Sequence, residues 1–312
     1  MLRRDLSARA HALARTQSLL HDISLGTSPA VIFGRDEQGR HGNFHSASYR
    51  NICANPAWAR RLTKVHTASR RSRARKDWQW MELDSANSSD ALLMNIFCHP
   101  AVFDGAILAP AVANLLNIDA ATQPCFGINP GVPLRTRRSR TNLSSDLPTK
   151  LVDRTEIDLH LGNLFLEAKL TESDFQTASP RLIERYRDLE TVFNVARLPQ
   201  KLSSPISPIS EPGQPEIDDT YLNVAKRPAK PLIQGYQLIR NVLAAFASDA
   251  SFCVLCDARR HDLIEIWYSV LSAVHYPSFA WRLKLLTWQE LATALPQNLQ
   301  QFLEAKYGIA PT

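Results

Sequence analysis

The sequence lacks the features that mark several common classes of protein. Its 312 residues include no run of about 18 or more apolar side chains, so no membrane-spanning helix is expected. It has only five cysteines, an odd number without dense spacing, which excludes a disulfide scaffold and favours a reducing compartment such as the cytoplasm. The motifs GxxxxGK[ST], GxGxxG, GxSxG and HExxH are all missing. A P-loop, a dinucleotide-binding turn, a nucleophile elbow and a zinc peptidase helix are therefore not expected.

Positive charge is concentrated in two places. The net charge is +6, and residues 60–76 include eight basic side chains and no acidic one. Such clusters suit a polyanion, because each neutralised phosphate releases counterions. A solvated basic loop explains either cluster equally well, so both interpretations stay open. The candidate nucleic-acid-binding residues are Arg70, Arg71, Arg73, Arg75 and Lys76, and the second cluster contains Arg135, Arg137, Arg138 and Arg140.

Hydrophobic periodicity and capping residues predict how the chain is organised. Helices are expected over residues 57–66, 89–97, 180–198, 232–247 and 261–274, and strands over 252–256 and 282–286. A further helix is expected to begin at Thr287, because Thr287 and Glu290 have the spacing of a capping box. Strand and helix thus alternate in the C-terminal half, which predicts a mixed sheet covered by helices.

Two compositional features complete this outline. Residues 199–231 hold seven of the 19 prolines, which predicts an extended or disordered insertion. Cys253 and Cys256 form a CxxC pair inside an apolar run, with no second pair to complete a zinc site. We therefore expect these two thiols to be buried on a strand.

A β-hairpin over residues 155–170 is the most informative segment. Apolar and polar residues alternate along both arms, and Gly162-Asn163 between them is a signal for a two-residue turn. This turn pairs Leu161 with Leu164, so Asp158 is predicted opposite Glu167 and Glu156 opposite Lys169. One face is then apolar, with Ile157, Leu159, Leu161, Leu164, Leu166, Ala168 and Leu170. The other carries Glu156, Asp158, His160, Phe165, Glu167 and Lys169.

The polar face of this hairpin has the composition of a metal site. Two carboxylates directly opposite each other repel, so a positive charge must offset them. A divalent cation would do so, because Mg²⁺ is commonly held by one or two carboxylates plus water and phosphate oxygens. A lysine on the same face could reach an attacking water or a phosphate. The alternative is an amphipathic hairpin with a solvated face and a Glu156–Lys169 cross-strand ion pair.

The spacing of Asp158 and the triplet Glu167-Ala168-Lys169 resembles the signature of the PD-(D/E)XK, or restriction-endonuclease-like, nuclease superfamily. The resemblance covers residues 88–294 and departs from the full signature, because Ile157 stands where proline is usual. It implies an α/β fold with the core order αβββαβ, a mixed central sheet flanked by helices, and a first core strand near residues 150–153. Residues 1–80 would be a helical, basic N-terminal extension, and residues 81–312 the nuclease-like domain.

The same resemblance implies roles for individual residues. Asp158, Glu167 and Lys169 would be catalytic, and Mg²⁺, for which Mn²⁺ can substitute, would be bound by both carboxylates and the Ala168 carbonyl. Supporting positions are weaker candidates. Glu82 or Asp90 would add an acidic ligand, although either also suits a helix start. Gln234, Gln237 and Asn241 would share one helix face toward the hairpin, although a solvent-facing side is as good an explanation, and Glu156 completes the polar face.

Two classes of function follow. The first is a Mg²⁺-dependent endonuclease that hydrolyses phosphodiester bonds in DNA, with a restriction-type enzyme as one form and RNA or branched DNA as other substrates. The second is a catalytically silent protein that keeps the fold and binds nucleic acid. Cleavage that requires a divalent metal separates the two. DNA is the expected partner in both, no membrane partner is expected, and a homodimer is one arrangement left open.

Overall fold

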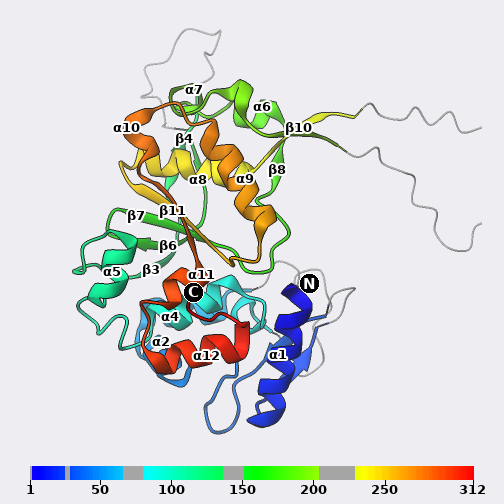
Figure 1. Ribbon diagram of the computed structural model, residues 1–312, viewed down its shortest axis with the longest axis vertical. Coiled ribbons are helices and arrows are strands. Elements are labelled where there is room, and N and C mark those ends of the chain that lie inside the picture. Colours follow the sequence, from blue (N-terminus) through cyan, green and yellow to red (C-terminus); the bar gives the residue numbers. More distant parts are fainter. Residues whose placement is uncertain (1, 25–28, 66–79, 136–150, 204–228) are drawn as a thin grey trace, which may run out of the picture.

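A mixed five-stranded sheet lies at the centre of the chain in the computed structural model, which describes residues 2–24, 29–65, 80–135, 151–203 and 229–312 (Figure 1). Its strand order is β12-β11-β7-β6-β3. The strands are β3 (Cys125–Ile128), β6 (Ile157–Leu161), β7 (Leu164–Ala168), β11 (Ser251–Cys256) and β12 (Leu283–Thr287). β3, β6 and β7 are joined antiparallel, whereas β7, β11 and β12 run parallel. The predicted mixed sheet is confirmed.

The predicted hairpin register is also confirmed at the turn. Gly162 has φ +58°, the left-handed conformation that such a two-residue turn needs. Leu161 pairs with Leu164, His160 with Phe165, and Leu159 with Leu166. Because the side-chain period of a strand is two, this register decides which residues of β6 and β7 share a face.

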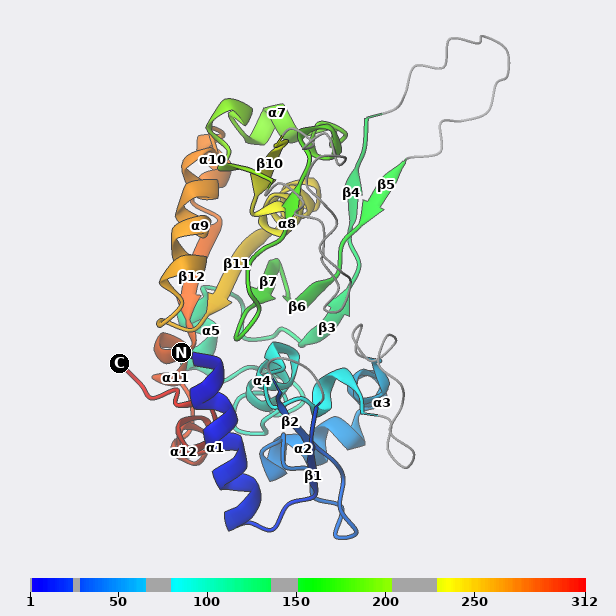
Figure 2. The same ribbon diagram turned by 90° about the vertical axis from the view of Figure 1, so that its right-hand side faces the viewer.

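Helices cover both faces of the sheet, as Figures 1 and 2 show. On one face lie α4 (Ser89–Phe97), α11 (Trp288–Ala292) and α12 (Gln297–Tyr307), and on the other lie α8 (Tyr236–Ala247) and α9 (His261–Ser272). The side chains of β11 divide between the two layers. Cys253 and Leu255 join the α4 side, while Phe252, Val254 and Cys256 join the α8 side. Both cysteines are thus buried on a strand, as predicted.

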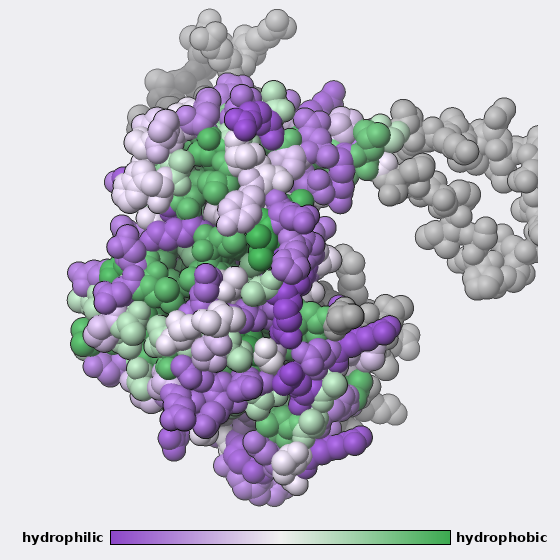
Figure 3. All heavy atoms as spheres, in the orientation of Figure 1, coloured by the Kyte–Doolittle hydropathy of each residue, from purple (hydrophilic) through white to green (hydrophobic). Residues whose placement is uncertain are grey.

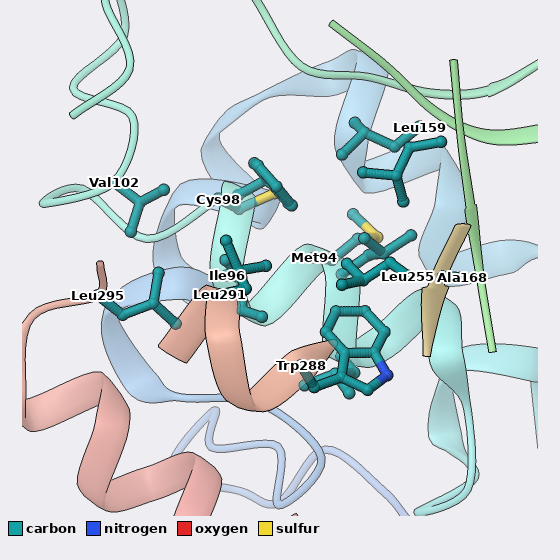
Figure 4. Packing of buried hydrophobic residues seen from close by; sticks show 14 of the residues in the cluster. Met94, Ile96, Cys98, Val102, Leu159, Ala168, Leu255, Trp288, Leu291 and Leu295 are labelled. Carbon is teal, nitrogen blue, oxygen red and sulfur yellow. The ribbon is translucent and has the colours of Figure 1, made fainter. Parts of the chain in front are cut away.

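The helical layer that contains α4 and α11 is tightly packed against its face of the sheet. In Figure 4, Met94 of α4 lies close to Leu159 and Leu255 of the sheet, and Trp288 of α11 lies beneath them. All four side chains are buried. The predicted capping box is present at the start of α11, where the Thr287 side chain accepts from the Glu290 amide and the Glu290 carboxylate accepts from Thr287. It orients α11 so that Trp288 enters the core.

The N-terminal residues pack onto this same layer. They form α1 (Leu2–Thr16), β1 (His21–Ile23), β2 (Val31–Phe33), α2 (Ser46–Ala54), α3 (Pro56–Ala59) and two 3₁₀ helices, η1 (Arg60–Thr63) and η2 (Glu82–Asp84). Leu6, Ile52 and Trp58 belong to the same hydrophobic cluster as Leu166 of β7. The predicted division of the chain at residue 80 stays a prediction.

Smaller elements complete the fold. They are α5 (Pro110–Leu116), β4 (Gly131–Pro133), β5 (Val152–Arg154), β8 (Thr177–Ala178), α6 (Pro180–Ile183), α7 (Leu189–Val192), η3 (Val195–Arg197), β9 (Gln200–Leu202), β10 (Pro231–Gln234) and α10 (Pro277–Ala280). β9 and β10 flank the proline-rich segment and pair antiparallel with each other. Most of that segment lies outside the described residues.

The prediction of one continuous helix over residues 180–198 is wrong. The structure has only the short helices α6, α7 and η3 there. The break lies where residues 185–187 bond to another segment: Arg135 N donates to Arg185 O at 2.8 Å and Arg187 N to Pro133 O at 3.0 Å. Backbone groups used in this way cannot continue a helix. Ser179 precedes α6 but makes no side-chain cap.

Three other expectations need correction. The prediction that residues 150–153 form the first strand of the core sheet is wrong, because β5 pairs with β4 and the strand beside β6 is β3. The helix predicted from residue 232 begins only at Tyr236, because residues 231–234 form β10 and Gly235 has φ +71°. The helix predicted over 57–66 is split into α3 and η1 and ends at Thr63.

Figure 3 shows one face of the molecule, on which apolar side chains gather near its middle, at the height of the sheet in Figure 1, among hydrophilic ones. Within the described residues, no helix combines the length and the apolar character needed to cross a membrane.

Candidate functional site

The site begins where the pairing of β6 and β7 ends. The last pair of this ladder is Leu159 with Leu166, one short of the predicted pairing of Asp158 with Glu167. In an unbroken antiparallel ladder, the Ala168 N–H would bond to the Ile157 carbonyl. Here it donates instead to Asp158 Oδ2, at 2.8 Å. The carboxylate of Asp158 thus replaces a backbone bond and is held between the two strands.

Glu167 lies on the face of β7 that is covered by α8, and its side chain is buried, with 1% exposed. Its Oε1 accepts from Lys169 Nζ at 2.9 Å and from Gln237 Nε2 at 2.5 Å. Its Oε2 accepts from Asn241 Nδ2 at 2.8 Å. Three donors, one directly after β7 and two in α8, therefore hold this carboxylate in one orientation.

Lys169 follows directly after β7, and contacts hold both its backbone and its side chain. Its backbone N–H donates to Leu255 O at 2.8 Å, and its carbonyl accepts from Trp288 Nε1 at 2.9 Å. The side chain is only 9% exposed, and its Nζ lies over the Phe175 ring, 5.7 Å from the ring centroid. The ammonium group is thus buried and oriented toward Glu167.

The protonation states in the site follow from burial and from neighbouring charge. Burial, together with the charge of Glu167, raises the pKa of Asp158 well above its ordinary value. Burial also raises the pKa of Glu167, although Lys169 opposes this. Burial alone would lower the pKa of Lys169, but Glu167, Glu172 and Asp158 outweigh it and the pKa is raised. Lys169 is therefore charged at neutral pH, whereas the two carboxylates repel each other.

A second charge cluster adjoins the first, at the beginning of α4. Arg61 Nη2 contacts Asp90 Oδ2 at 2.5 Å, and Arg61 Nη1 contacts Glu156 Oε1 at 2.9 Å. Lys64 Nζ reaches Glu156 at 2.7 Å, Glu82 at 3.2 Å and Asp90 at 3.4 Å. These contacts join η1, α4 and the start of β6, so this cluster, here called the Arg61 clamp, fixes one side of the site.

Gly127 of β3 makes room for the Arg61 clamp. Its φ is +64°, and a Cβ added there would lie 2.0 Å from Arg61 Nη1 and 2.7 Å from Arg61 Cζ. Arg61 is mostly buried and Asp90 is 7% exposed, so a displaced guanidinium would leave a buried carboxylate with weaker pairing.

We expect Gly127→Ala to destabilise the protein by about 1–3 kcal/mol, because a Cβ at positive φ is strained and the displaced Arg61 pairs less well with Asp90. Chemical denaturation would measure it. Gly39→Ala is the matched control, because Gly39 has φ +76° but its nearest neighbour would be 3.6 Å from a Cβ, so only the backbone cost of about 1 kcal/mol is expected. A Gly127→Ala effect that simply adds to that of Arg61→Ala would contradict the steric explanation.

The structure brings together most of the predicted site residues, and the roles proposed for them remain predictions. Asp158, Glu167, Lys169 and Gln237 are linked by the contacts above, with Ala168 at their centre. Asp90, Glu82 and Glu156 lie in the Arg61 clamp. The segment with Arg70, Arg71, Arg73, Arg75 and Lys76 lies outside the described residues.

Some details of the predicted polar face are wrong. Glu156 pairs with Arg61 and Lys64, not with Lys169, and Ile157 joins the α8 layer instead of the α4 layer. Both changes occur beyond the last β6–β7 pair, where the ladder no longer imposes its alternation. Gln234 is also misplaced: it ends β10 opposite Thr177, before α8 begins, and does not share a helix face with Gln237 and Asn241.

Sequence reasoning missed four residues of the site. Glu172 accepts from the Leu170 amide at 2.7 Å and from Ser89 Oγ at 2.6 Å, which ties the segment after β7 to α4. Thr155 donates to Asn241, and Arg61 and Lys64 form the clamp. The only local signal was the position of Glu172, three residues beyond Lys169. The other three meet the site through long-range contacts.

The donor set fits a divalent cation. Among the described residues no hydrogen-bond donor reaches Asp158 Oδ1, and Glu167 Oε2 accepts a single bond, so each oxygen retains a lone pair. Among the described residues, acidic side chains also outnumber basic ones around the site: Glu82, Asp90, Glu156, Asp158, Glu167 and Glu172 against Arg61, Lys64, Lys169 and Arg260. In the described part of the chain no three or more Asp, Glu, His or Cys side chains form a preformed metal cluster. A pair of carboxylates completed by backbone, water and phosphate oxygens is nevertheless usual for Mg²⁺.

The chain was compared with known proteins. Residues 20–308 match the model of a family described as "Restriction Endonuclease associating with ARP". No curated protein and no solved structure matches the chain. The match begins at residue 20, so it includes most of the N-terminal segment together with the sheet and the site. Since it spans nearly the whole sequence, the chain belongs to this restriction-endonuclease-like family.

Proposed function

We propose that the protein is a Mg²⁺-dependent endonuclease of the PD-(D/E)XK type that hydrolyses phosphodiester bonds in DNA. One observation carries the proposal: two carboxylates, the half-buried Asp158 and the buried Glu167, lie beside the charged Lys169 where two strands separate. Among the central-sheet strands and their two flanking helices α4 and α8, the order α4, β3, β6, β7, α8, β11 supports it, because this is the order expected of the αβββαβ core, with smaller elements inserted. DNA is proposed as the substrate from the family description.

In this proposal the two carboxylates bind the cation. Asp158 Oδ1 and Glu167 Oε2 would be ligands, and the Ala168 carbonyl would add a third. When bound, Mg²⁺ would supply the positive charge that acidifies an attacking water and neutralises phosphate. Gln237 and Asn241 would keep the Glu167 carboxylate oriented through the bonds they already make to it.

Lys169 would act as a fixed positive charge. The neighbouring carboxylates raise its pKa, so its ammonium group keeps its proton at neutral pH. Its ammonium group can donate to an oxygen that gains negative charge as the phosphodiester bond breaks. Burial strengthens this interaction, since the site contains less screening water than the surface.

A plasmid-cleavage assay tests the proposal. Purified protein is incubated with supercoiled DNA over a series of Mg²⁺ and Mn²⁺ concentrations, and nicked and linear products are separated on a gel. We expect cleavage that depends on the metal and stops with EDTA. Absence of cleavage with either metal, accompanied by salt-sensitive DNA binding that EDTA does not change, would instead support a catalytically silent DNA-binding protein.

A further inference from the structure

A buried chain of two hydrogen bonds runs behind Glu167. Thr155 Oγ1 donates to Asn241 Oδ1 at 2.7 Å, and Asn241 Nδ2 donates to Glu167 Oε2 at 2.8 Å. Thr155 and Asn241 are both 0% exposed. Thr155 stands just before β6 and Asn241 is in α8, so the chain of bonds joins three separate elements.

We propose that Thr155 and Asn241 form a positioning relay that orients Glu167 for a divalent cation, an inference that rests on the proposed function. Neither residue would touch the metal or the DNA. Asn241 would set the position of Oε2, and Thr155 would set the orientation of the Asn241 amide. The relay extends the site to residues behind the two carboxylates.

The chemistry of the three groups determines which of them donates each hydrogen bond of the relay. An ionised carboxylate only accepts hydrogen bonds, so Asn241 must turn its NH₂ group toward Glu167 and its carbonyl toward Thr155. The Thr155 hydroxyl then donates to that carbonyl, because an amide oxygen can only accept a hydrogen bond. Without the hydroxyl, Asn241 Oδ1 would be buried without a donor, which costs about 1–3 kcal/mol. Rotation of the amide away from Glu167 would relieve this cost.

The position of Asn241 explains why Gln237 does not make it redundant. Gln237 is one helical turn earlier in α8, is partly exposed, and donates to Oε1, which Lys169 also contacts. Asn241 is the donor that the structure shows on Oε2. Oε2 is also the oxygen of Glu167 with the fewest bonds, and it is the one proposed as a ligand. Loss of the relay would therefore affect the ligand oxygen directly.

The test measures Mn²⁺ binding to the full chain by isothermal titration calorimetry, with plasmid cleavage as a second readout. Thr155→Val removes the hydroxyl but keeps the shape of the side chain. We expect it to weaken Mn²⁺ binding by about tenfold, as for other groups that orient metal ligands. Thr155→Ser keeps the hydroxyl and is expected to bind within about twofold of the unmodified chain.

One further variant tests whether any valine substitution of a buried threonine weakens Mn²⁺ binding, and another replaces Thr155→Val if that variant does not fold. Thr122→Val alters a threonine that is also buried but lies beside Gly162, at the turn end of the hairpin, so its Mn²⁺ binding is expected to be unchanged. Should Thr155→Val fail to fold, Thr155→Ala removes the same hydroxyl without a second methyl group.

The outcomes separate the relay from the proposed function. No Mn²⁺ binding by the unmodified chain would overturn the proposed function, and the relay with it. Normal binding by both the unmodified chain and Thr155→Val would overturn the relay alone. Equal weakening in Thr155→Ser and Thr155→Val would also overturn it, because packing and not the hydroxyl would then be responsible.

Discussion

Replacing Lys169 with methionine is expected to slow DNA cleavage by about 10²–10³-fold, the usual effect of removing one preorganised charge-stabilising donor. Methionine has a similar length, and its thioether is compatible with the Phe175 ring that lies near the Lys169 ammonium group. The change removes the only cation that contacts Glu167 in the described structure. Single-turnover cleavage at saturating Mg²⁺ would measure the chemical step without the complication of product release.

Lys284→Met is the matched control for this variant. Lys284 lies on edge strand β12 and donates to Leu116 O at 2.8 Å, away from the carboxylates. We expect it to cleave DNA at the rate of the unmodified chain. Lys169→Met also leaves Glu167 buried without its ion pair, so circular dichroism must show that the variant is folded at the assay temperature. A folded Lys169→Met protein with full activity would exclude Lys169 from catalysis.

Asp158→Asn is expected to have opposite effects on stability and on cleavage. In EDTA the variant should be more stable by about 1–3 kcal/mol, because it removes a charge that desolvation and Glu167 both disfavour. The amide oxygen can still accept the Ala168 N–H, so the bond that ends the β6–β7 ladder is kept. Cleavage should be lost, since a carboxylate proposed to bind the metal is gone. Thermal unfolding in EDTA and the plasmid assay measure the two effects.

The stability gain of Asp158→Asn should depend on pH in a definite direction. The pKa of Asp158 is raised in the folded chain above its ordinary value of 3.8, so ionisation costs more in the folded than in the unfolded state. The gain is therefore complete above the folded-state pKa of Asp158, and it disappears as the pH falls toward 3.8. A gain that grew on acidification would contradict the assignment of Asp158 as a buried, repelled carboxylate.

Added Mg²⁺ should narrow or reverse the difference in stability between the unmodified chain and Asp158→Asn. A metal at 100 times its dissociation constant stabilises the protein that binds it by about 2.7 kcal/mol. The unmodified chain is expected to gain this amount and Asp158→Asn much less. Equal stabilisation of both proteins by Mg²⁺ would place the metal somewhere other than Asp158.

Features that depend on neighbours in sequence could be predicted well. The turn at Gly162-Asn163 determined the pairing of Leu161 with Leu164, and the Thr287–Glu290 capping box began α11 as expected. The segments of α4, α9, β11 and β12 were found within a few residues. Each is specified by a local period or by a cap, and these act over a few residues.

Features that depend on distant segments could not be predicted in this way. The apolar stripe over residues 180–198 suggested one helix, but bonds from residues 133–135 interrupt it. Gln234 was placed on the wrong element because β8 and β9 pair with the residues before α8. In both cases tertiary hydrogen bonds outweighed a local preference worth only fractions of a kcal/mol per residue.

The sequence by itself determined that Asp158, Glu167 and Lys169 come from one hairpin with a defined turn, because strand alternation and the two-residue turn are local. Only the tertiary structure decided what surrounds them. Asp158 replaces a ladder bond to Ala168, Asn241 and Gln237 of α8 hold Glu167, and the Arg61 clamp joins η1, α4 and β6. These contacts join residues far apart in the sequence, and folding brings them together by packing both helical layers against the sheet.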